Sequence, residues 1–255
     1  MSEMLFPPWV IFHIPHDSIA IPDNLRNQFV LTDAQLQQEL MKMTDLHTFE
    51  LFADGLPEHQ IVRFPISRLV VDVERFEDDS DEPMAPRGMG VIYKSTHELK
   101  PLRIDLKIDE RSDLINSWYH PHHLALSNAV DYALKLFNRA LIVDAHSFPS
   151  IPLPYENNSY ALRPEICIGT DDFHTPIDLI STMAKQLRLL GLEVAINTPF
   201  SGAIVPSKHY QQDGRVASVM IEVRRDLYLN EENGTLKDDW ELVSKKIRKG
   251  LLTWL

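Results

Sequence analysis

The feature that most constrains the fold is a short apolar run with a polar end, Ile142-Val143-Asp144-Ala145-His146-Ser147. An uninterrupted apolar run of this length is typical of a parallel strand that is covered on both faces. Open α/β sheets carry their chemistry at the carboxyl ends of such strands. Residues 11–17 and 219–225 have the same form, with His16 and Glu222 near their ends. We therefore expect three strand ends to share one pocket.

Strand-like runs alternate with helical patterns along the chain. Apolar spacings of three and four predict helices within 36–49, 126–137, 177–190 and 240–254, with Pro121, Gly191 and Thr235 as boundary residues. Strands are expected at 9–14, 61–64, 69–73, 140–143, 165–168, 192–196 and 216–223. This alternation predicts an α/β fold with a mixed, largely parallel sheet and helices on both faces. At 255 residues the chain fits one core, so we predict a single domain over 1–255.

The composition restricts the partners of the protein. A net charge of −12 argues against nucleic acid or an anionic membrane surface, but a small anionic substrate needs only a few local arginines. No apolar run approaches the roughly 20 residues that span a bilayer. The single cysteine, Cys167, excludes an internal disulfide, and the N-terminus lacks the basic start of a signal peptide. We expect a cytoplasmic protein, and the sequence leaves its oligomeric state open.

The segment 77–82 is a run of acidic residues followed by proline and glycine. A solvated loop is the favoured interpretation, and a lid over the pocket is the alternative.

Two histidines are candidate metal ligands because each lies at the end of an apolar strand. A catalytic zinc often has two histidines and one carboxylate as ligands, which fits His16 and His146 with a third residue. A bound metal activates water, and a nearby carboxylate accepts the proton. Glu222 suits this base because its apolar strand raises its pKa, although a buried salt bridge is the alternative. His13 is expected to be buried. In the 120–123 cluster, packing at the helix start is the favoured interpretation, and His123 is the member that could instead face a pocket and bind substrate.

Other catalytic signatures are absent from the sequence. We find no HExxH, CxxC, glycine-rich phosphate loop or G-x-S-x-G, so Ser147 is a weak candidate for a nucleophile.

Arginines gather near the same strand ends. Arg68 and Arg75 flank the run 69–73, and Arg224 and Arg225 follow Glu222. An arginine fork matches a carboxylate, so these residues indicate a substrate with one or two carboxylates. The alternative is a set of structural salt bridges with neighbouring acids, which we favour for at least one of Arg224 and Arg225.

Five ordered stretches resemble the N-formylglutamate amidohydrolase family. They are Ile14-Pro15-His16-Asp17, the arginine-flanked run 67–75, Asp144-Ala145-His146-Ser147, the loop 197–202 and the run 221–228. The family more often has Asn where this chain has Glu74. The resemblance implies a fold similar to zinc exopeptidases of the carboxypeptidase A kind. It also implies one zinc per chain, hydrolysis of N-formyl-L-glutamate to formate and glutamate, and a place in histidine degradation.

The resemblance also implies roles for particular residues. The carboxypeptidase pattern would put a glutamate three residues after the first histidine, but Ile19 stands there. We expect Asp45 as the third ligand instead, with Asp17 as the alternative, and Asp144 as a residue that orients a ligand. The full set is His16, Asp45 and His146 for the metal, Glu222 as base, and Arg68, Arg75, Arg225, His123, Asn197 and Gly202 for the substrate, of which Asn197 and Gly202 shape the acyl pocket.

Two other functions remain open. One is a related hydrolase with another N-acyl amino acid or a short peptide as substrate, because Glu74 and the segment 77–82 add negative charge near the arginines. The other is a binding protein that keeps the pocket and has lost turnover.

Overall fold

The structure is a computed structural model that describes residues 6–156 and 163–254. Within these residues six strands form one sheet in the order β2-β1-β3-β6-β4-β5. All neighbouring pairs are parallel except β4 and β6, so the sheet is mixed and mostly parallel, as predicted. The strands are β1 Val10–Ile14, β2 Ile61–Arg63, β3 Ala140–Phe148, β4 Ile166–Gly169, β5 Val194–Ile196 and β6 Val216–Arg224.

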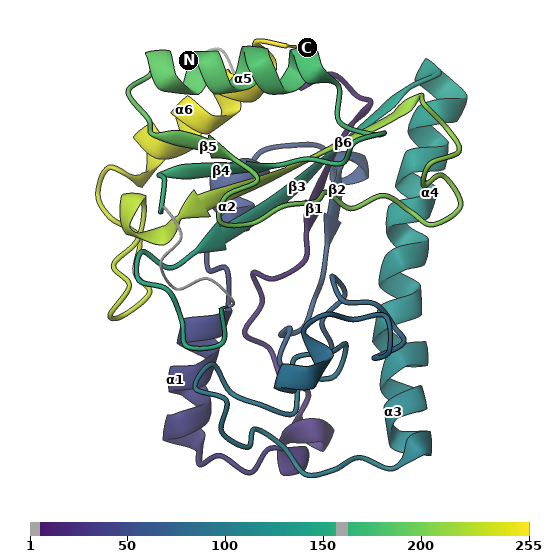
Figure 1. Cartoon of the computed structure of the whole chain (residues 1–255), viewed down its shortest axis with the longest axis vertical. Coiled ribbons are helices and arrows are strands. Elements are labelled where there is room, and N and C mark those ends of the chain that lie inside the picture. The colour runs from purple at the N-terminus through teal and green to yellow at the C-terminus, as the bar shows by residue number, and fades with distance from the viewer. Residues whose placement is uncertain (1–5, 157–162, 255) are drawn as a thin grey trace.

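Helices cover both faces of this sheet (Figure 1). The helices α2, α5 and α6 pack with apolar side chains of one sheet face, and α4 packs on the other. Their bounds are α1 Asp33–Met43, α2 Thr48–Phe52, α3 Ile108–Leu114, α4 His120–Phe137, α5 Ile177–Leu189 and α6 Trp240–Leu252. One π-helical turn, Ile115–Tyr119, joins α3 to α4. None of the helices in the described part of the chain is long and apolar enough to cross a membrane.

A second apolar cluster lies below the sheet in Figure 1 and includes residues of α1 and of the long segment before α4. It buries Leu36, Leu40, Val71, Tyr93 and Leu114 among others. The functional residues described below lie between this cluster and the sheet.

The period of two in the strands decides which side chains face that space. Val143 and Ala145 of β3 join the core beneath α5 and α6, so Asp144 and His146 point to the opposite face. On β6, Ile221 and Val223 belong to the same core, which turns Glu222 toward the face of His146. The alternation of side chains along β3 and β6 therefore packs apolar side chains into the core on one face and brings the polar ones together on the other.

Three sequence predictions about these elements are wrong. The run 69–73 is not a strand. The side chain of Ser67 accepts the N–H of Leu69, and that of Asp72 accepts the N–H of Glu74. Arg103 donates to the carbonyls of Leu69 and Val70. Those bonds satisfy the backbone without a sheet partner. The other two errors concern a helix start and a helix break.

The closing helix starts at Trp240 after Asp239, while the hydroxyl of Thr235 donates to Asn233 and does not cap the helix. The pattern over 36–49 is two helices, because the backbone N–H of Asp45 donates to the carbonyl of His16 at 2.9 Å. This bond interrupts the helix between α1 and α2, and it places Asp45 beside the end of β1.

Candidate active site

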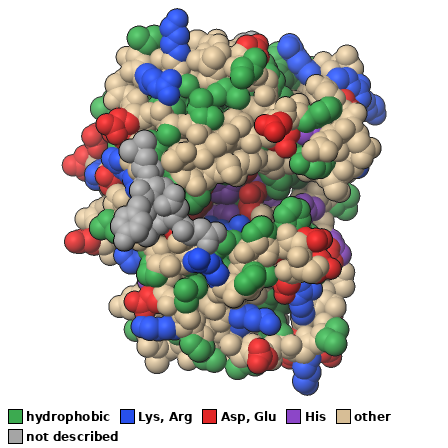
Figure 2. Space-filling model, in the orientation of Figure 1, with side chains coloured by type: hydrophobic (Ala, Val, Ile, Leu, Met, Phe, Trp, Pro, Cys, Tyr) green, Lys and Arg blue, Asp and Glu red, His purple; other side chains and the backbone are tan. Residues whose placement is uncertain are grey.

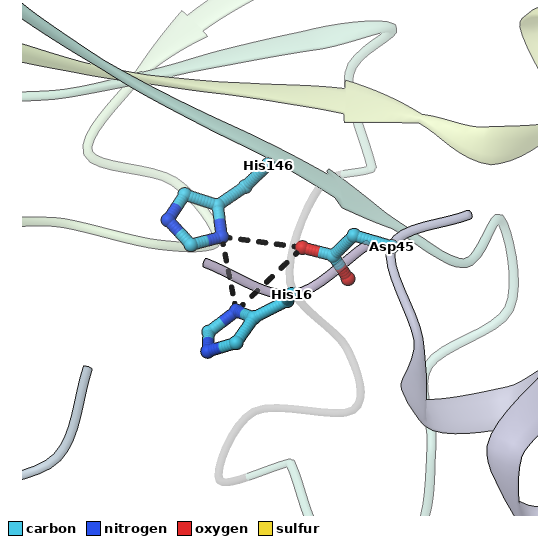
Figure 3. A group of neighbouring side chains, drawn as sticks. All are labelled: His16, Asp45 and His146. Atoms are coloured by element: carbon cyan, nitrogen blue, oxygen red, sulfur yellow. Dashed lines mark hydrogen bonds and ion pairs between the residues drawn. The ribbon is translucent and has the colours of Figure 1, made fainter. Parts of the chain in front are cut away.

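His16, Asp45 and His146 come together from three separate segments (Figure 3). The Nδ1 atoms of the two histidines are 3.3 Å apart, and Asp45 Oδ2 lies 3.2 Å from His146 Nδ1 and 3.8 Å from His16 Nδ1. All three side chains are buried. In a tetrahedral site with ligands about 2.0–2.1 Å from zinc, neighbouring ligand atoms lie roughly 3.3 Å apart. The three atoms therefore have the spacing of a metal-ligand set.

The far side of each imidazole ring is held by a carboxylate. His16 Nε2 lies 2.8 Å from Asp72 Oδ1, and His146 Nε2 lies 3.0 Å from Asp144 Oδ1. An ionised carboxylate only accepts, so each Nε2 donates, and in the neutral form of each ring, which binds metals, Nδ1 carries the lone pair. Two lone pairs and a carboxylate oxygen then face one another, an arrangement that a cation satisfies. This carboxylate–histidine pairing is typical of metal sites.

The charges of the site favour a cation. Burial opposes ionisation of Asp72, but Arg68 and His16 outweigh it and hold the pKa of Asp72 well below its usual value. Burial likewise lowers the pKa of His146, but Asp144, Asp45 and Glu74 together raise it well above its usual value. The carboxylates around His146 thus create a strongly negative field.

Arg225 is the residue that positions Asp45. Its Nη2 donates to Asp45 Oδ1 at 2.8 Å, its Nη1 donates to the carbonyl of Lys42 at 2.7 Å, and its Nε donates to Ser147 Oγ at 3.2 Å. All three guanidinium nitrogens are engaged within the protein, so these bonds do not support the predicted role in substrate binding. Arg224 pairs with Asp226 at 2.7 Å, so both arginines have protein partners, which agrees with the expected structural role for at least one of them.

Glu222 lies directly opposite His146 in the β3–β6 register. The residue is 8% exposed, and its Oε2 is buried without a hydrogen-bond partner among the described residues. Burial, the largest effect, raises the pKa of Glu222 to about 7, with Asp45 adding to the shift and His146 opposing it. A free carboxyl oxygen with this pKa beside the ligand group suits an acid–base residue.

The two predicted arginines differ in how tightly they are held. Arg68 Nη2 pairs with Asp72 Oδ2 at 2.7 Å, and Tyr93 donates to the same oxygen at 2.5 Å. Arg75 Nε is 3.8 Å from Asp72 Oδ2, and it has no hydrogen-bond partner in the described part of the chain. Arg75 is also the more exposed side chain, at 22% against 11% for Arg68. Arg75 thus keeps more capacity for an external anion.

The remaining predicted residues lie further from the three-ligand group. His123 Nε2 donates to the carbonyl of Val73 at 2.9 Å. Asn197 bonds through both side-chain atoms to Thr170, and Gly202 has a φ of 100° in the loop after β5. The structure thus brings none of these three into a hydrogen bond with the ligand residues, and their substrate roles stay predictions.

Asp17, the alternative ligand, forms an ion pair with Arg63 at 2.7 Å and is absent from the group around His146. Ile19 is 47% exposed. The geometry therefore favours Asp45 over Asp17 and position 19 as the third metal ligand.

From the sequence, Asp72 and Glu74 are candidates for salt bridges with arginine, and neither is expected to contact a histidine. Asp72 holds His16, and Glu74 Oε2 lies 3.6 Å from His146 Nε2. Burial and the neighbouring Asp144 raise the pKa of Glu74 to about 8. The sequence feature that could have pointed to Asp72 is its place between two arginines. Its histidine partner, His16, is 56 positions away, so no local pattern shows that contact.

A hollow in the surface gives access to this region. Figure 2 shows histidine, acidic and basic side chains gathered in a recess between the sheet and the apolar cluster below it. A recess lined with such groups suits a small polar substrate.

Fold and site together define an α/β protein with a buried group of two histidines and an aspartate on one sheet face, a donor set typical of metal-dependent hydrolases. The family model for N-formylglutamate amidohydrolase matches residues 9–229. The chain therefore belongs to the N-formylglutamate amidohydrolase family.

The relatives agree with this assignment. An N-formylglutamate deformylase of Pseudomonas putida is 25% identical over 260 residues, covering 96% of this chain and 92% of the deformylase. The crystal structure of an N-formylglutamate amidohydrolase from Ralstonia eutropha JMP134 superposes with a TM-score of 0.80 at 21% identity, covering 96% of this chain and 91% of that one. A gene product of Agrobacterium tumefaciens superposes with a TM-score of 0.66 at 22% identity, covering 96% and 90%. These structures confirm the predicted fold class.

Proposed function

We propose that this protein is a zinc-dependent hydrolase that converts N-formyl-L-glutamate into formate and glutamate. One observation carries the proposal: His16 Nδ1, His146 Nδ1 and Asp45 Oδ2 converge at ligand spacing beside the free carboxyl oxygen of Glu222. Family membership and the deformylase relative support the choice of substrate.

His16, Asp45 and His146 are the proposed metal ligands. When bound, zinc would lower the pKa of a water molecule to about 7 and polarise the formyl carbonyl. Two imidazoles and one carboxylate fit zinc better than calcium or magnesium, which take oxygen ligands. Asp72, Asp144 and Arg225 keep the three ligands in their orientation.

Glu222 is the proposed proton carrier of the reaction. Its carboxylate accepts a proton from the attacking water while the water oxygen bonds to the formyl carbon. The same proton then goes to the leaving nitrogen as the C–N bond breaks, giving formate and the amine of glutamate. A pKa of about 7 allows both transfers near neutral pH.

Arg75 and Arg68 are the proposed partners of the substrate carboxylates. Their positive charges lie on the same side of the site as Asp72, and Arg75 has the less engaged guanidinium. Glu74 lies nearby, but a pKa of about 8 keeps it mostly uncharged at neutral pH, so it does not repel a dicarboxylate. Asn197, Gly202 and His123 remain candidates for the rest of the substrate site.

A screen of N-acyl amino acids, with and without chelator, tests this proposal. We expect release of formate from N-formyl-L-glutamate, lower activity on N-formyl-L-glutamine, and loss of activity with chelator. Hydrolysis of another N-acyl amino acid or a short peptide alone would favour a related hydrolase. Metal binding without turnover on any substrate would favour the non-catalytic binding protein.

Ligand variants test the metal directly. His146→Ala should abolish zinc binding at this group, whereas His209→Ala, which removes a histidine paired with Asp131 elsewhere, should leave it unchanged. A cytoplasmic location, a single domain over 1–255 and a place in histidine degradation stay part of the proposal.

A further inference from the structure

A second group of potential ligands lies on the other side of the His146 ring. His13 Nδ1 is 2.8 Å from Asp144 Oδ1 and 3.3 Å from Glu74 Oε1. One nitrogen and two carboxylate oxygens lie within 4.8 Å of one another. None of these three residues belongs to the ligand set of His16, Asp45 and His146.

Two oxygens of this second group lack partners. Glu74 Oε1 and Asp144 Oδ2 are buried without a hydrogen bond to any described residue, and Asp144 is 1% exposed. The His13 nitrogen, although 3.3 Å from Glu74 Oε1, makes its hydrogen bond to Asp144. An unpaired buried carboxyl oxygen is costly, and holding both carboxyl groups in the charged form side by side is costly as well. A bound cation would remove both costs at once.

His13 is able to present a lone pair to such a cation. Its Nε2 lies 2.8 Å from Nε2 of His122, so one of these two nitrogens donates and the other accepts. When His13 is the donor, its proton is on Nε2 and its Nδ1 lone pair faces Asp144 and Glu74. In the other form, the His13 proton is on Nδ1 and His122 is the donor. Going from one form to the other only moves protons between the ring nitrogens of the two histidines, so no proton is lost overall.

We propose that His13, Glu74 and Asp144 form a second site for a divalent first-row cation such as Zn²⁺ or Mn²⁺. One imidazole nitrogen with two carboxylate oxygens matches the mixed ligand preference of these ions. The site is reached from the side of Glu74, whose side chain is 17% exposed while that of His13 is fully buried. The two sites share no ligand residue, so their ions can be counted separately, although Asp144 also orients His146 of the first site.

Equilibrium dialysis of chelator-treated protein against Zn²⁺, and separately against Mn²⁺, tests this site by counting bound ions at saturation. We expect two zinc ions per wild-type chain, one in Glu74→Gln, and one in His13→Gln. His16→Ala should also bind one ion, because it loses the first site and keeps the second. Glu77→Gln is the matched control: Glu77 is an acidic residue paired with His120 at the surface, so this variant should keep two ions.

Glu74→Gln is the decisive variant because it preserves the shape of a partly exposed side chain, and circular dichroism of each variant verifies its fold. Saturation of the wild type at a single ion, with Glu74→Gln unchanged from it, would overturn the second site. In that case the loss of the ion in His16→Ala would still support the first site. If His16→Ala binds as many ions as the wild type, the proposed catalytic metal fails instead.

Discussion

Replacement of Arg225 by methionine tests how the site holds its third ligand. Asp45 and Arg225 are 2% and 6% exposed, and the Asp45 carboxylate accepts a 2.8 Å bond from the guanidinium. The sequence indicated a substrate contact at Arg225, whereas its bonds in the structure go to Asp45, Lys42 and Ser147. The two roles predict different outcomes for one variant.

The expected effect is large because the variant leaves a buried charge unpaired. Removing one partner of a buried ion pair costs ~3–5 kcal/mol of stability. Metal affinity should also fall by about 10- to 100-fold, the usual effect of removing a residue that orients a ligand. A bound metal compensates Asp45 in part, so the stability loss should be largest in chelator-treated protein.

Urea unfolding in chelator and zinc dialysis measure these two effects. Arg224→Met is the matched control, because Arg224 is the adjacent arginine and its partner Asp226 is 42% exposed. An exposed pair of this kind contributes about 1 kcal/mol or less. If Arg225→Met keeps its stability and zinc affinity and only raises KM, then Arg225 binds substrate and our account of Asp45 is wrong.

Three further predictions concern the charged groups of the site. Glu222→Gln should lower the rate of hydrolysis by about 10²- to 10⁴-fold and leave zinc bound. In the wild type, kcat/KM should rise as the pH rises through about 7, because only the charged carboxylate accepts a proton. A flat profile below pH 8 would argue against this base. Arg75→Gln should raise KM for N-formyl-L-glutamate about 10-fold or more and leave bound zinc unchanged. The control Arg188→Gln on α5 should not change KM. If Arg75→Gln has the KM of the wild type, Arg75 does not contact a substrate carboxylate. The raised pKa of Glu74 means that its proton stabilises the metal-free fold at low pH, and this contribution is lost as pH rises from about 4.5 to about 8. Urea unfolding in chelator should therefore show Glu74→Gln gaining stability relative to wild type at pH 8.5 but not at pH 4.5, and a constant difference would contradict the shift.

Local patterns in the sequence predicted most of the sheet. Apolar runs located β1, β3 and β6, and their polar ends identified His16, His146 and Glu222. The strand β3 extends to Phe148, beyond the expected end at 143, because β6 pairs with it over nine positions. Alternation along paired strands thus places the polar side chains of both strands on one face. The sequence alone does not show which strands pair and so does not show this shared face.

The contacts that bring Asp45 and Asp72 to His16 join distant segments, and in the sequence only the family resemblance indicates Asp45 as a ligand. Asp45 becomes adjacent to His16 only through a backbone bond that breaks a helical pattern. The run 69–73 has the composition of a strand, but Arg103 from a later segment bonds its carbonyls and leaves Asp72 free to hold His16. Neither bond has a local signature.

The most direct test of the central claim is formate release from N-formyl-L-glutamate by chelator-treated protein during titration with zinc. Our account predicts no activity in the metal-free protein and recovery of full activity as the site of His16, Asp45 and His146 fills. The same titration of His146→Ala should give no recovery. Full activity in metal-free wild-type protein, or recovery in His146→Ala equal to wild type, would contradict the account.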